Sequence, residues 1–120
     1  MNYQIISKDS TRYIEVFSCE VPVNSELDAL DLVALCGEND IDLLLLHYEA
    51  LSEDFFKLKT GVAGAVIQNF INYRIRVAII IPDQEQLSTN FKAWISEANR
   101  SSQYRFFSNS ADAVDWLIHP

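Results

Sequence analysis

Apolar and polar residues follow two different periods along the chain, and each change of period marks a boundary between a strand and a helix. Short runs rich in Ile, Tyr, Val and Phe occur at Tyr3–Ser7 and Arg12–Phe17, with polar residues 8–11 between them. In the second run Ile14 and Val16 lie on one face of the strand. This pattern predicts a β-hairpin at the start of the chain.

Two later runs are apolar without interruption. Leu43–Leu46 follows Asp42, and Arg76–Ile81 is closed by Pro82-Asp83. Short continuous apolar runs are typical of parallel strands that are covered on both faces. We therefore expect two adjacent interior strands, followed by a last short strand at Tyr104–Phe107.

Helical spacing separates these strands. Ser25 with Asp28 resembles a capping pair, and Gly37 is a typical place for a helix to end. Gly61, Gly64 and Ala65 would allow the second helix to lie close to the sheet. The four predicted helices run from Asn24-Ser25 to about Gly37 (with Leu27, Leu30, Val33 and Ala34 at helical spacing), over Gly61–Tyr73 (with Val62, Val66, Phe70 and Tyr73), over Gln84–Asn99 (with Leu87, Phe91, Trp94, Ile95 and Ala98), and from Ser108-Asn109-Ser110 through Leu117.

The predicted order is β-β-α-β-α-β-α-β-α over residues 1–120, in one domain of the α/β class. Strands that alternate with helices imply right-handed crossovers and a mixed, mostly parallel sheet with an N-terminal hairpin. The helices are expected to cover one face of the sheet or both faces.

The net charge of −8 narrows the set of partners. Binding to nucleic acid or to an anionic membrane surface needs a basic surface, so neither is expected. The longest apolar runs are too short to span a bilayer, and the N-terminus has no signal-peptide pattern. Together with the two cysteines, Cys19 and Cys36, which form no metal or redox motif, these features favour the cytoplasm. The negative charge favours a basic protein partner.

Motifs for known chemistry are absent from the sequence. It has no HxxxH, HxH or CxxC metal pattern, no G-x-S-x-G nucleophile elbow, no P-loop and no GxGxxG. No metal and no cofactor is therefore expected.

Three segments resemble a small bacterial family catalogued as a domain of unknown function (family 4180). They are DFFKLKTGVAGAVIQNFINYR at Asp54–Arg74, Ser96–Arg100, and FFSNSADAVDWL at Phe106–Leu117. The order of elements is also similar to that of STAS domains, the anti-sigma-factor antagonists, and of their lipid-binding-like relatives. That similarity is an analogy of fold. It implies a STAS-like domain that binds proteins and is switched by phosphorylation of a hydroxyl near a helix N-terminus.

The carboxyl ends of parallel strands are the usual place for a ligand, and His47 directly follows a predicted buried strand. Its imidazole could act as a base or bind a metal with Glu49 or Asp54. A structural alternative is a strand-end histidine that is hydrogen-bonded to nearby backbone.

Thr60 is the candidate phosphoacceptor. If Gly61 opens the next helix, the Thr60 hydroxyl caps it, and a phosphate there would meet free N–H groups with Lys59 adding positive charge. Ser52 is a rival cap and acceptor. Plain helix capping is the structural alternative for both hydroxyls.

Phe55 and Phe56 cannot both face inward if their loop is helical, so one ring is a candidate protein contact. The family segments also contain polar residues that could form either a shared interaction site or helix-end hydrogen bonds. These further interaction candidates are Asp54, Gln68, Asn72, Arg74, Glu97 and Asn99.

Three functions remain open. The first is a non-catalytic regulatory or protein-interaction module, with another protein or a second copy as its partner in a homodimer. The second is a small enzyme with a strand-end site around His47. The third is a binder of a small apolar ligand, which needs a cavity beneath Phe55, Phe56 and Val66.

Overall fold

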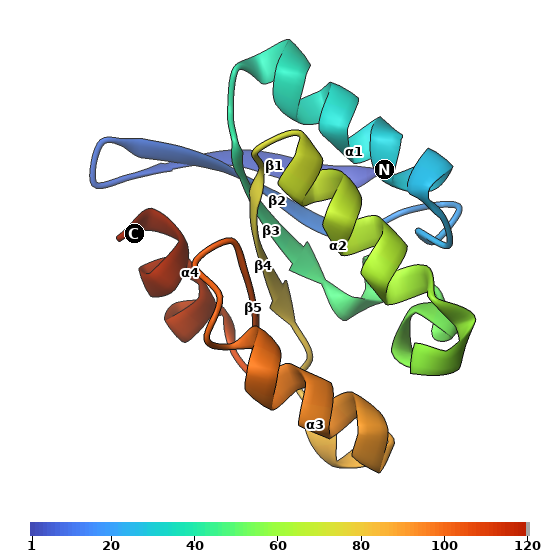
Figure 1. Cartoon of the computed structure of the whole chain (residues 1–120). Coiled ribbons are helices and arrows are strands. Elements are labelled where there is room, and N and C mark those ends of the chain that lie inside the picture. The colour runs from blue at the N-terminus through green and yellow to red at the C-terminus, as the bar shows by residue number, and fades with distance from the viewer. Residues whose placement is uncertain (120) are drawn as a thin grey trace.

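The structure is a computed structural model that describes residues 1–119. It contains a five-stranded sheet with helices on both faces (Figure 1). The strands lie in chain order and only the first pair is antiparallel, which confirms the expected α/β fold class. The strands are β1 (Asn2–Lys8), β2 (Thr11–Ser18), β3 (Leu43–His47), β4 (Arg76–Ile80) and β5 (Tyr104–Phe107), and the α-helices are α1 (Glu26–Asn39), α2 (Val62–Asn72), α3 (Thr89–Ala98) and α4 (Ser110–Ile118).

The predicted hairpin is confirmed. Lys8 pairs with Thr11, so the turn consists of Asp9 and Ser10 alone. Both turn residues have positive φ angles, 51° and 64°. Two successive residues in this region are typical of the tight turns whose twist matches that of paired strands. The hairpin makes β1 an edge strand of the sheet, and most of its residues are exposed.

The two apolar runs form interior strands, as expected. β3 lies between β2 and β4, and the register places Leu44 beside Val77 and Leu46 beside Ile79. Leu44 and Leu46 point to the core beneath α1, α2 and α3, whereas Leu45 points to α4. Right-handed crossovers between strands in chain order put the three crossover helices on one face, which leaves α4 to cover the other.

The first turn of α1 has the predicted cap. The Ser25 hydroxyl accepts a hydrogen bond from the Asp28 N–H at 3.2 Å, and the Asp28 carboxylate accepts one from the Asn24 N–H at 2.9 Å. The predicted end near Gly37 is two residues early. The helix continues through Asn39 and stops at Asp40, which adopts the left-handed conformation at φ 53°.

The buried face of α1 differs from the residues whose spacing predicted the helix. Leu27 is 74% exposed and Leu30 is 36% exposed. Leucines at 27, 30, 32 and 35 give the helix two apolar stripes, and periodicity alone does not select between them. The buried residues are Ala29, Leu32, Leu35 and Cys36.

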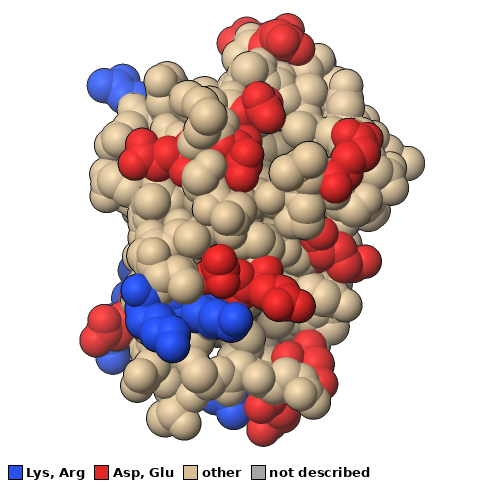
Figure 2. Space-filling model, turned by 90° about the vertical axis from the view of Figure 1, so that its right-hand side faces the viewer, with Lys and Arg blue, Asp and Glu red and all other residues tan. Residues whose placement is uncertain are grey.

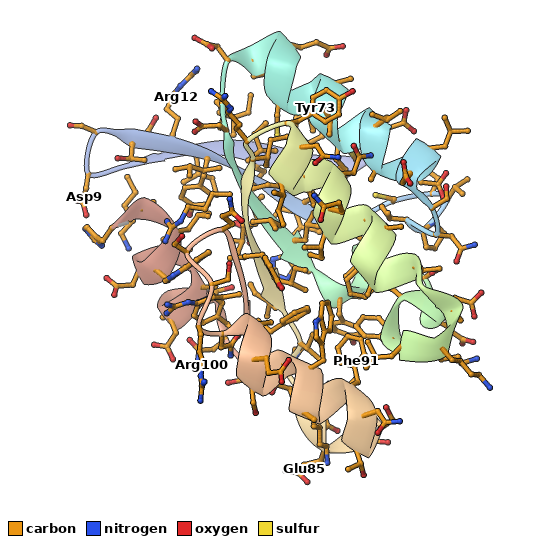
Figure 3. All side chains as sticks on the ribbon, in the orientation of Figure 1. Asp9, Arg12, Tyr73, Glu85, Phe91 and Arg100 are labelled. Carbon is orange, nitrogen blue, oxygen red and sulfur yellow. The ribbon has the colours of Figure 1, made fainter. Side chains whose placement is uncertain are left out.

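In α2 the expected core face is largely confirmed, but the glycines play a different role. Gly61 precedes the helix with φ 76°, and a side chain at Gly64 would meet no atom within 4 Å. The prediction that these glycines bring the helix close to the sheet is therefore wrong. Tyr73, expected on the apolar stripe, is 55% exposed and lies beside α1 (Figure 3).

The helix predicted from Gln84 begins later. Gln84–Gln86 forms a short 3₁₀ helix, η4, and α3 starts at Thr89. The Ser88 hydroxyl accepts a hydrogen bond from the Phe91 N–H at 3.1 Å. This cap satisfies a free N–H of the first turn and fixes the start of the helix there.

The long connection after β3 contains three 3₁₀ helices, η1 (Tyr48–Ala50), η2 (Glu53–Phe56) and η3 (Leu58–Thr60). Its first part pairs with the segment before α1, because the Val23 N–H donates to the Ala50 carbonyl and the Ser52 N–H donates to the Val23 carbonyl. Within residues 1–119, no helix combines the length and the apolar character needed to cross a membrane.

Candidate functional site

The carboxyl ends of β3 and β4 bring two connections together at one edge of the sheet. We call this edge the rim, and define it as residues 47–60 after β3 and residues 81–90 after β4. Parallel strands place the starts of their following connections side by side. The rim contains the 3₁₀ helices η1 to η4 and the start of α3.

His47 ends β3, and its imidazole contacts an acidic residue that lies on the neighbouring strand. His47 Nε2 lies 2.7 Å from Glu15 Oε2. Both side chains are mostly buried, with exposed fractions of 19% and 13%. The ring also stacks on Phe17, with centroids 5.0 Å apart. The imidazole is therefore fixed in orientation by β2.

The enzyme hypothesis paired His47 with Glu49 or Asp54, whereas the carboxylate that contacts His47 in the structure is that of Glu15. Glu49 is exposed in η1, and the Asp54 carboxylate lies 3.9 Å from Lys57 Nζ. A carboxylate that orients an imidazole is suited to acid–base work. Residues 1–119 contain no group of three His, Cys, Asp or Glu residues placed to hold a metal ion.

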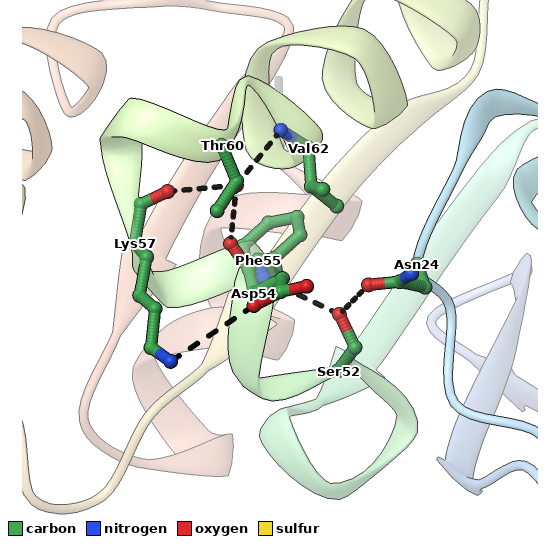
Figure 4. Close-up of polar contacts among 7 residues, drawn as sticks. All are labelled: Asn24, Ser52, Asp54, Phe55, Lys57, Thr60 and Val62. Atoms are coloured by element: carbon green, nitrogen blue, oxygen red, sulfur yellow. Dashed lines mark hydrogen bonds and ion pairs between the residues drawn. The ribbon is translucent and has the colours of Figure 1, made fainter.

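Ser52 holds the η2 turn in place (Figure 4). Its hydroxyl accepts a hydrogen bond from the Phe55 N–H at 3.3 Å and donates one to Asn24 Oδ1 at 2.7 Å. The first bond caps η2, as the sequence predicted, and the second joins the rim to the residue before α1. Ser52 is half-buried, and its hydroxyl already has one hydrogen-bond donor and one acceptor as partners.

Thr60 closes η3 rather than capping α2 in the expected position. Its hydroxyl donates a shared hydrogen bond to two carbonyls, that of Asp54 at 2.7 Å and that of Lys57 at 2.8 Å. It also accepts a hydrogen bond from the Val62 N–H at 3.2 Å, so it does satisfy one N–H of the first turn of α2 (Figure 4). Gly61, not Thr60, is the residue that immediately precedes the helix.

The two phenylalanines of η2 divide as the sequence required. Phe55 is fully buried, whereas Phe56 is half-buried and packs edge-on against it at 5.2 Å. The ring of Phe91, on α3, packs against both rings, with its centroid 6.3 Å from that of Phe55 and 5.7 Å from that of Phe56. In Figure 3 the Phe91 side chain extends from α3 toward this loop. These contacts fix the position of the Phe56 ring at the surface.

A cavity of about 340 Å³ lies on one side of Phe56. Its lining is mainly apolar, and Asp83 and Gln86 form its polar edge. Its volume is at the lower end of the range of ligand pockets. An apolar-ligand binder would need a cavity beneath Phe55, Phe56 and Val66, but Phe55 and Val66 are fully buried and do not line this cavity. The apolar lining comes from Tyr48, Phe56, Ile81, Pro82 and Leu87.

A second cavity, of about 230 Å³, shares Phe56 with the first and has a different charge. Lys57 and Lys59 line it together with Leu58, Ser88 and Asn90. Both lysines are exposed. On the face shown in Figure 2, most of the Lys and Arg side chains in view gather in the lower half, next to acidic side chains. The rim thus combines an apolar cavity and a cationic cavity that share the Phe56 ring.

The comparison with protein families gives a match over residues 8–117 to the family described as "Domain of unknown function (DUF4180)". The chain belongs to this family. Comparison with curated proteins gives no match, and comparison with solved structures gives none either. The expected likeness of this DUF4180 domain to STAS domains is therefore not confirmed by these comparisons.

The basic character of the cavity that Lys57 and Lys59 line in this DUF4180 domain was missed from the sequence, although a signal for it exists. All 17 Asp and Glu residues lie outside residues 55–82, and that segment carries Lys57, Lys59, Arg74 and Arg76. Net charge averages over the chain and hides such segregation. A scan of charge along the sequence would have found it.

The polar residues at the end of α2 lie away from the rim. Gln68 Nε2 donates to Asn72 Oδ1 at 2.9 Å on the exposed face of the helix. Arg74 follows in the left-handed conformation at φ 59°, and its N–H donates to the Ile71 carbonyl. Asn69, which was not a candidate, is buried and donates to the Glu26 carbonyl at 2.9 Å, which joins α2 to α1.

Asn99 contacts the outer strand of the sheet. Its amide nitrogen donates to the Phe106 carbonyl at 3.1 Å, and its amide oxygen accepts from the Phe106 N–H at 2.9 Å. The side chain thus gives β5 the two hydrogen bonds that a neighbouring strand would give. Glu97, its fellow candidate, is exposed on α3.

A further structural contact that the sequence did not reveal involves Arg76 and α4. Its guanidinium donates to the carbonyls of Trp116 and Leu117, at 2.8 and 2.6 Å, and lies 3.7 Å from the centroid of the Trp116 ring. Burial and the nearby Arg105 lower the pKa of Arg76. The arginine therefore caps the carboxyl end of α4 and fixes that helix to β4.

Neither cysteine has the properties of a nucleophile. Burial raises the pKa of the Cys36 thiol to about 11, and the negative charge of Asp42 adds to the effect. Burial also raises the pKa of Cys19. Since the thiolate is the reactive form, both thiols are poor nucleophiles at neutral pH.

Proposed function

We propose that this chain is a non-catalytic protein-interaction module with a regulatory role, and that its binding surface is the rim. One observation carries the proposal. The apolar cavity beside Phe56 opens at the surface and adjoins a cationic cavity across the same ring. A concave apolar surface bordered by charge is typical of a site that takes an anchor side chain from a partner.

The fixed position of Phe56 supports this function. Its ring is held by Phe55 and Phe91, and Ser52 ties the η2 turn to Asn24. A preformed surface loses little conformational entropy when a partner binds. Tyr48, which is 43% exposed at the edge of the apolar cavity, adds an aromatic side chain of the kind enriched in protein interfaces.

Site-specific photo-crosslinking in cells tests the proposal. A benzophenone amino acid replaces Tyr48 at the rim, and the matched control replaces Tyr3 on β1, which is 41% exposed. We expect one defined protein to crosslink from position 48 and not from position 3. A Leu87→Lys substitution in the apolar cavity should abolish that crosslink. Equal crosslinking from both positions, or none from position 48, would contradict the proposal.

Thr60 is the proposed regulatory position. Thr60 is an exposed residue, and its hydroxyl donates to the Asp54 and Lys57 carbonyls. Phosphorylation would remove that donor and add negative charge beside the two lysines. Mass spectrometry of the protein from cells should find one phosphate on Thr60, and Thr60→Glu should weaken the crosslink from position 48. An unmodified Thr60 under all growth conditions would oppose a regulatory role for it.

A second candidate function is acid–base catalysis at His47, favoured by its 2.7 Å contact with Glu15. A carboxylate-held imidazole can accept a proton from water or from a substrate hydroxyl. A screen of ester and phosphoester substrates, with His47→Gln as the control, tests this function. Turnover by the parent chain that is absent from His47→Gln would favour the enzyme over the interaction module.

A further inference from the structure

We propose that the partner segment bound at the rim is acidic, with one apolar anchor followed by Asp or Glu side chains. The inference rests on the proposed function, since it names the chemistry of the partner that the rim would take. The anchor enters the apolar cavity beside Phe56, and the carboxylates lie against Lys57 and Lys59.

Charge complementarity carries the choice of partner. The chain has a net charge of −8, but the cavity on the lysine side of Phe56 is lined by two Lys residues and no acid. Lys57 has a long ion pair with Asp54, at 3.9 Å, and both side chains are about half exposed. Within residues 1–119, Lys59 has no carboxylate at ion-pair distance. A cationic cavity on an anionic protein favours an anionic segment and disfavours a basic one.

The geometry also gives the segment a direction. Asp83 lies at the edge of the apolar cavity, and its carboxylate accepts the Glu85 N–H at 3.2 Å. The lysines line the second cavity, which shares Phe56 with the first and contains no acid. A segment that crosses Phe56 therefore meets negative charge at one end and positive charge at the other. The acids of the partner belong on the lysine side of its anchor, and not on the Asp83 side.

Polar side chains complete the cationic cavity. Ser88 and Asn90 line it together with the lysines, and both are exposed residues. An amide N–H can donate to a carboxylate, so these groups suit an acidic side chain better than an apolar one. Exposed ion pairs contribute little each, and the apolar anchor is expected to supply most of the affinity.

Peptide binding measured by fluorescence polarisation tests the inference. The probe is a fluorescein-labelled peptide in which one Trp is followed by Gly and two Glu residues. Control peptides replace both Glu by Lys, replace Trp by Gly, or replace the two Glu by one phosphoserine. We expect the acidic Trp peptide to bind, and the Lys peptide and the peptide without Trp to bind about tenfold more weakly, because they lose the two ion pairs or the anchor. The phosphoserine peptide carries a similar negative charge and should bind no more tightly than the acidic Trp peptide.

Variants then locate the binding. Lys57→Glu combined with Lys59→Glu should weaken binding of the acidic peptide about tenfold, whereas Lys8→Glu, a single charge reversal at an exposed lysine on β1, should leave it unchanged. If the double variant has an altered urea transition, Lys59→Ala replaces it in the binding measurement and should also weaken binding of the acidic peptide. Absence of binding, equal binding of the Lys peptide, or preference for the phosphoserine peptide overturns the inference.

The crosslinking experiment separates this inference from the proposed function. A protein captured from position 48 whose capture is insensitive to the two lysine reversals would leave the interaction module standing and refute the acidic partner. No capture from position 48 would refute both.

Discussion

Glu15 and His47 come from neighbouring parallel strands and lie 2.7 Å apart with little solvent around them. Glu15 pairs with Leu45 in the register of β2 on β3, and His47 lies two residues farther along β3, so both side chains point to the same face of the sheet. Removing one member of a mostly buried hydrogen-bonded pair lowers stability more than removing one at the surface, because the remaining polar group stays desolvated without a partner. The pair is therefore a structural element whether or not it takes part in chemistry.

Replacing either member of this pair should destabilise the fold. We expect Glu15→Gln and His47→Gln each to lower the free energy of unfolding by about 1–2 kcal/mol, and the double variant to lose less than the sum of the two. Urea denaturation followed by far-UV circular dichroism gives the three values. Glu49→Gln, an exposed acid in η1, is the control and should be close to the parent.

Asn69 joins α2 to α1 from a buried position, with an amide nitrogen 2.9 Å from the Glu26 carbonyl. We expect Asn69→Asp to lower the free energy of unfolding by about 2–3 kcal/mol, because a carboxylate would then face that carbonyl with no donor between them. The exposed neighbour Gln68 offers a matched control, Gln68→Glu, which should change stability by less than about 0.5 kcal/mol. Equal effects at the two positions would contradict the role assigned to Asn69.

The buried thiol of Cys36 should make the protein less stable in alkali. Its pKa is about 11 in the folded chain, against an ordinary value of 9.0, so the folded state keeps a proton that the unfolded state loses. The contribution of this thiol to the free energy of unfolding is therefore fully present below about pH 9. It falls by up to roughly 2 kcal/mol as the pH rises toward about 11. Urea transitions at several pH values measure the fall.

Cys36→Ala supplies the control for the alkaline loss. The variant is less stable overall because it removes buried sulfur, but its stability should depend less on pH between about 9 and 11. A thiol reagent at neutral pH should modify half-exposed Cys19 slowly in the folded chain, and Cys36 only after unfolding. An unchanged alkaline slope in Cys36→Ala would assign the loss to other groups.

Arg76 secures α4 through two carbonyls and a stacked ring. We expect Arg76→Lys to lower the free energy of unfolding by about 1–2 kcal/mol, because a single ammonium cannot reproduce the planar fork and the stacking. Arg76→Met should lose more. Hydrogen exchange should show faster exchange in α4 for both variants. Arg74→Met, at an exposed arginine two residues away, should leave exchange in α4 unchanged.

The interior of the fold could be predicted from the sequence because few alternatives fit it. The leucine run at 43–46 and the isoleucine cluster at 77–81 are too short for buried helices and too apolar for an exposed strand. The hairpin followed from polar residues between two alternating runs. The buried face of α1 could not be predicted in the same way, because its leucines form two apolar faces. Only packing against β2 and β3 decides which face is buried.

The site was predicted less well, for a different physical reason. His47 was found because it follows a buried strand, but its partner Glu15 is remote in sequence, and only the register of β2 on β3 brings them together. The cavities beside Phe56 also arise from segments on two different connections. Local patterns give the position of a residue within an element, whereas the neighbours of a surface residue depend on how the elements are arranged.

The amide of Asn99 has a consequence for how the sheet can be extended. It occupies the outward N–H and carbonyl of Phe106, so an incoming strand would have to displace a side chain that already supplies both bonds. The hairpin strand β1, at the other edge, is seven residues long and contains no acid. Addition of a strand, from another copy or from a foreign peptide, is accordingly directed to the β1 edge of the sheet, whereas the Asn99 side chain blocks the β5 edge.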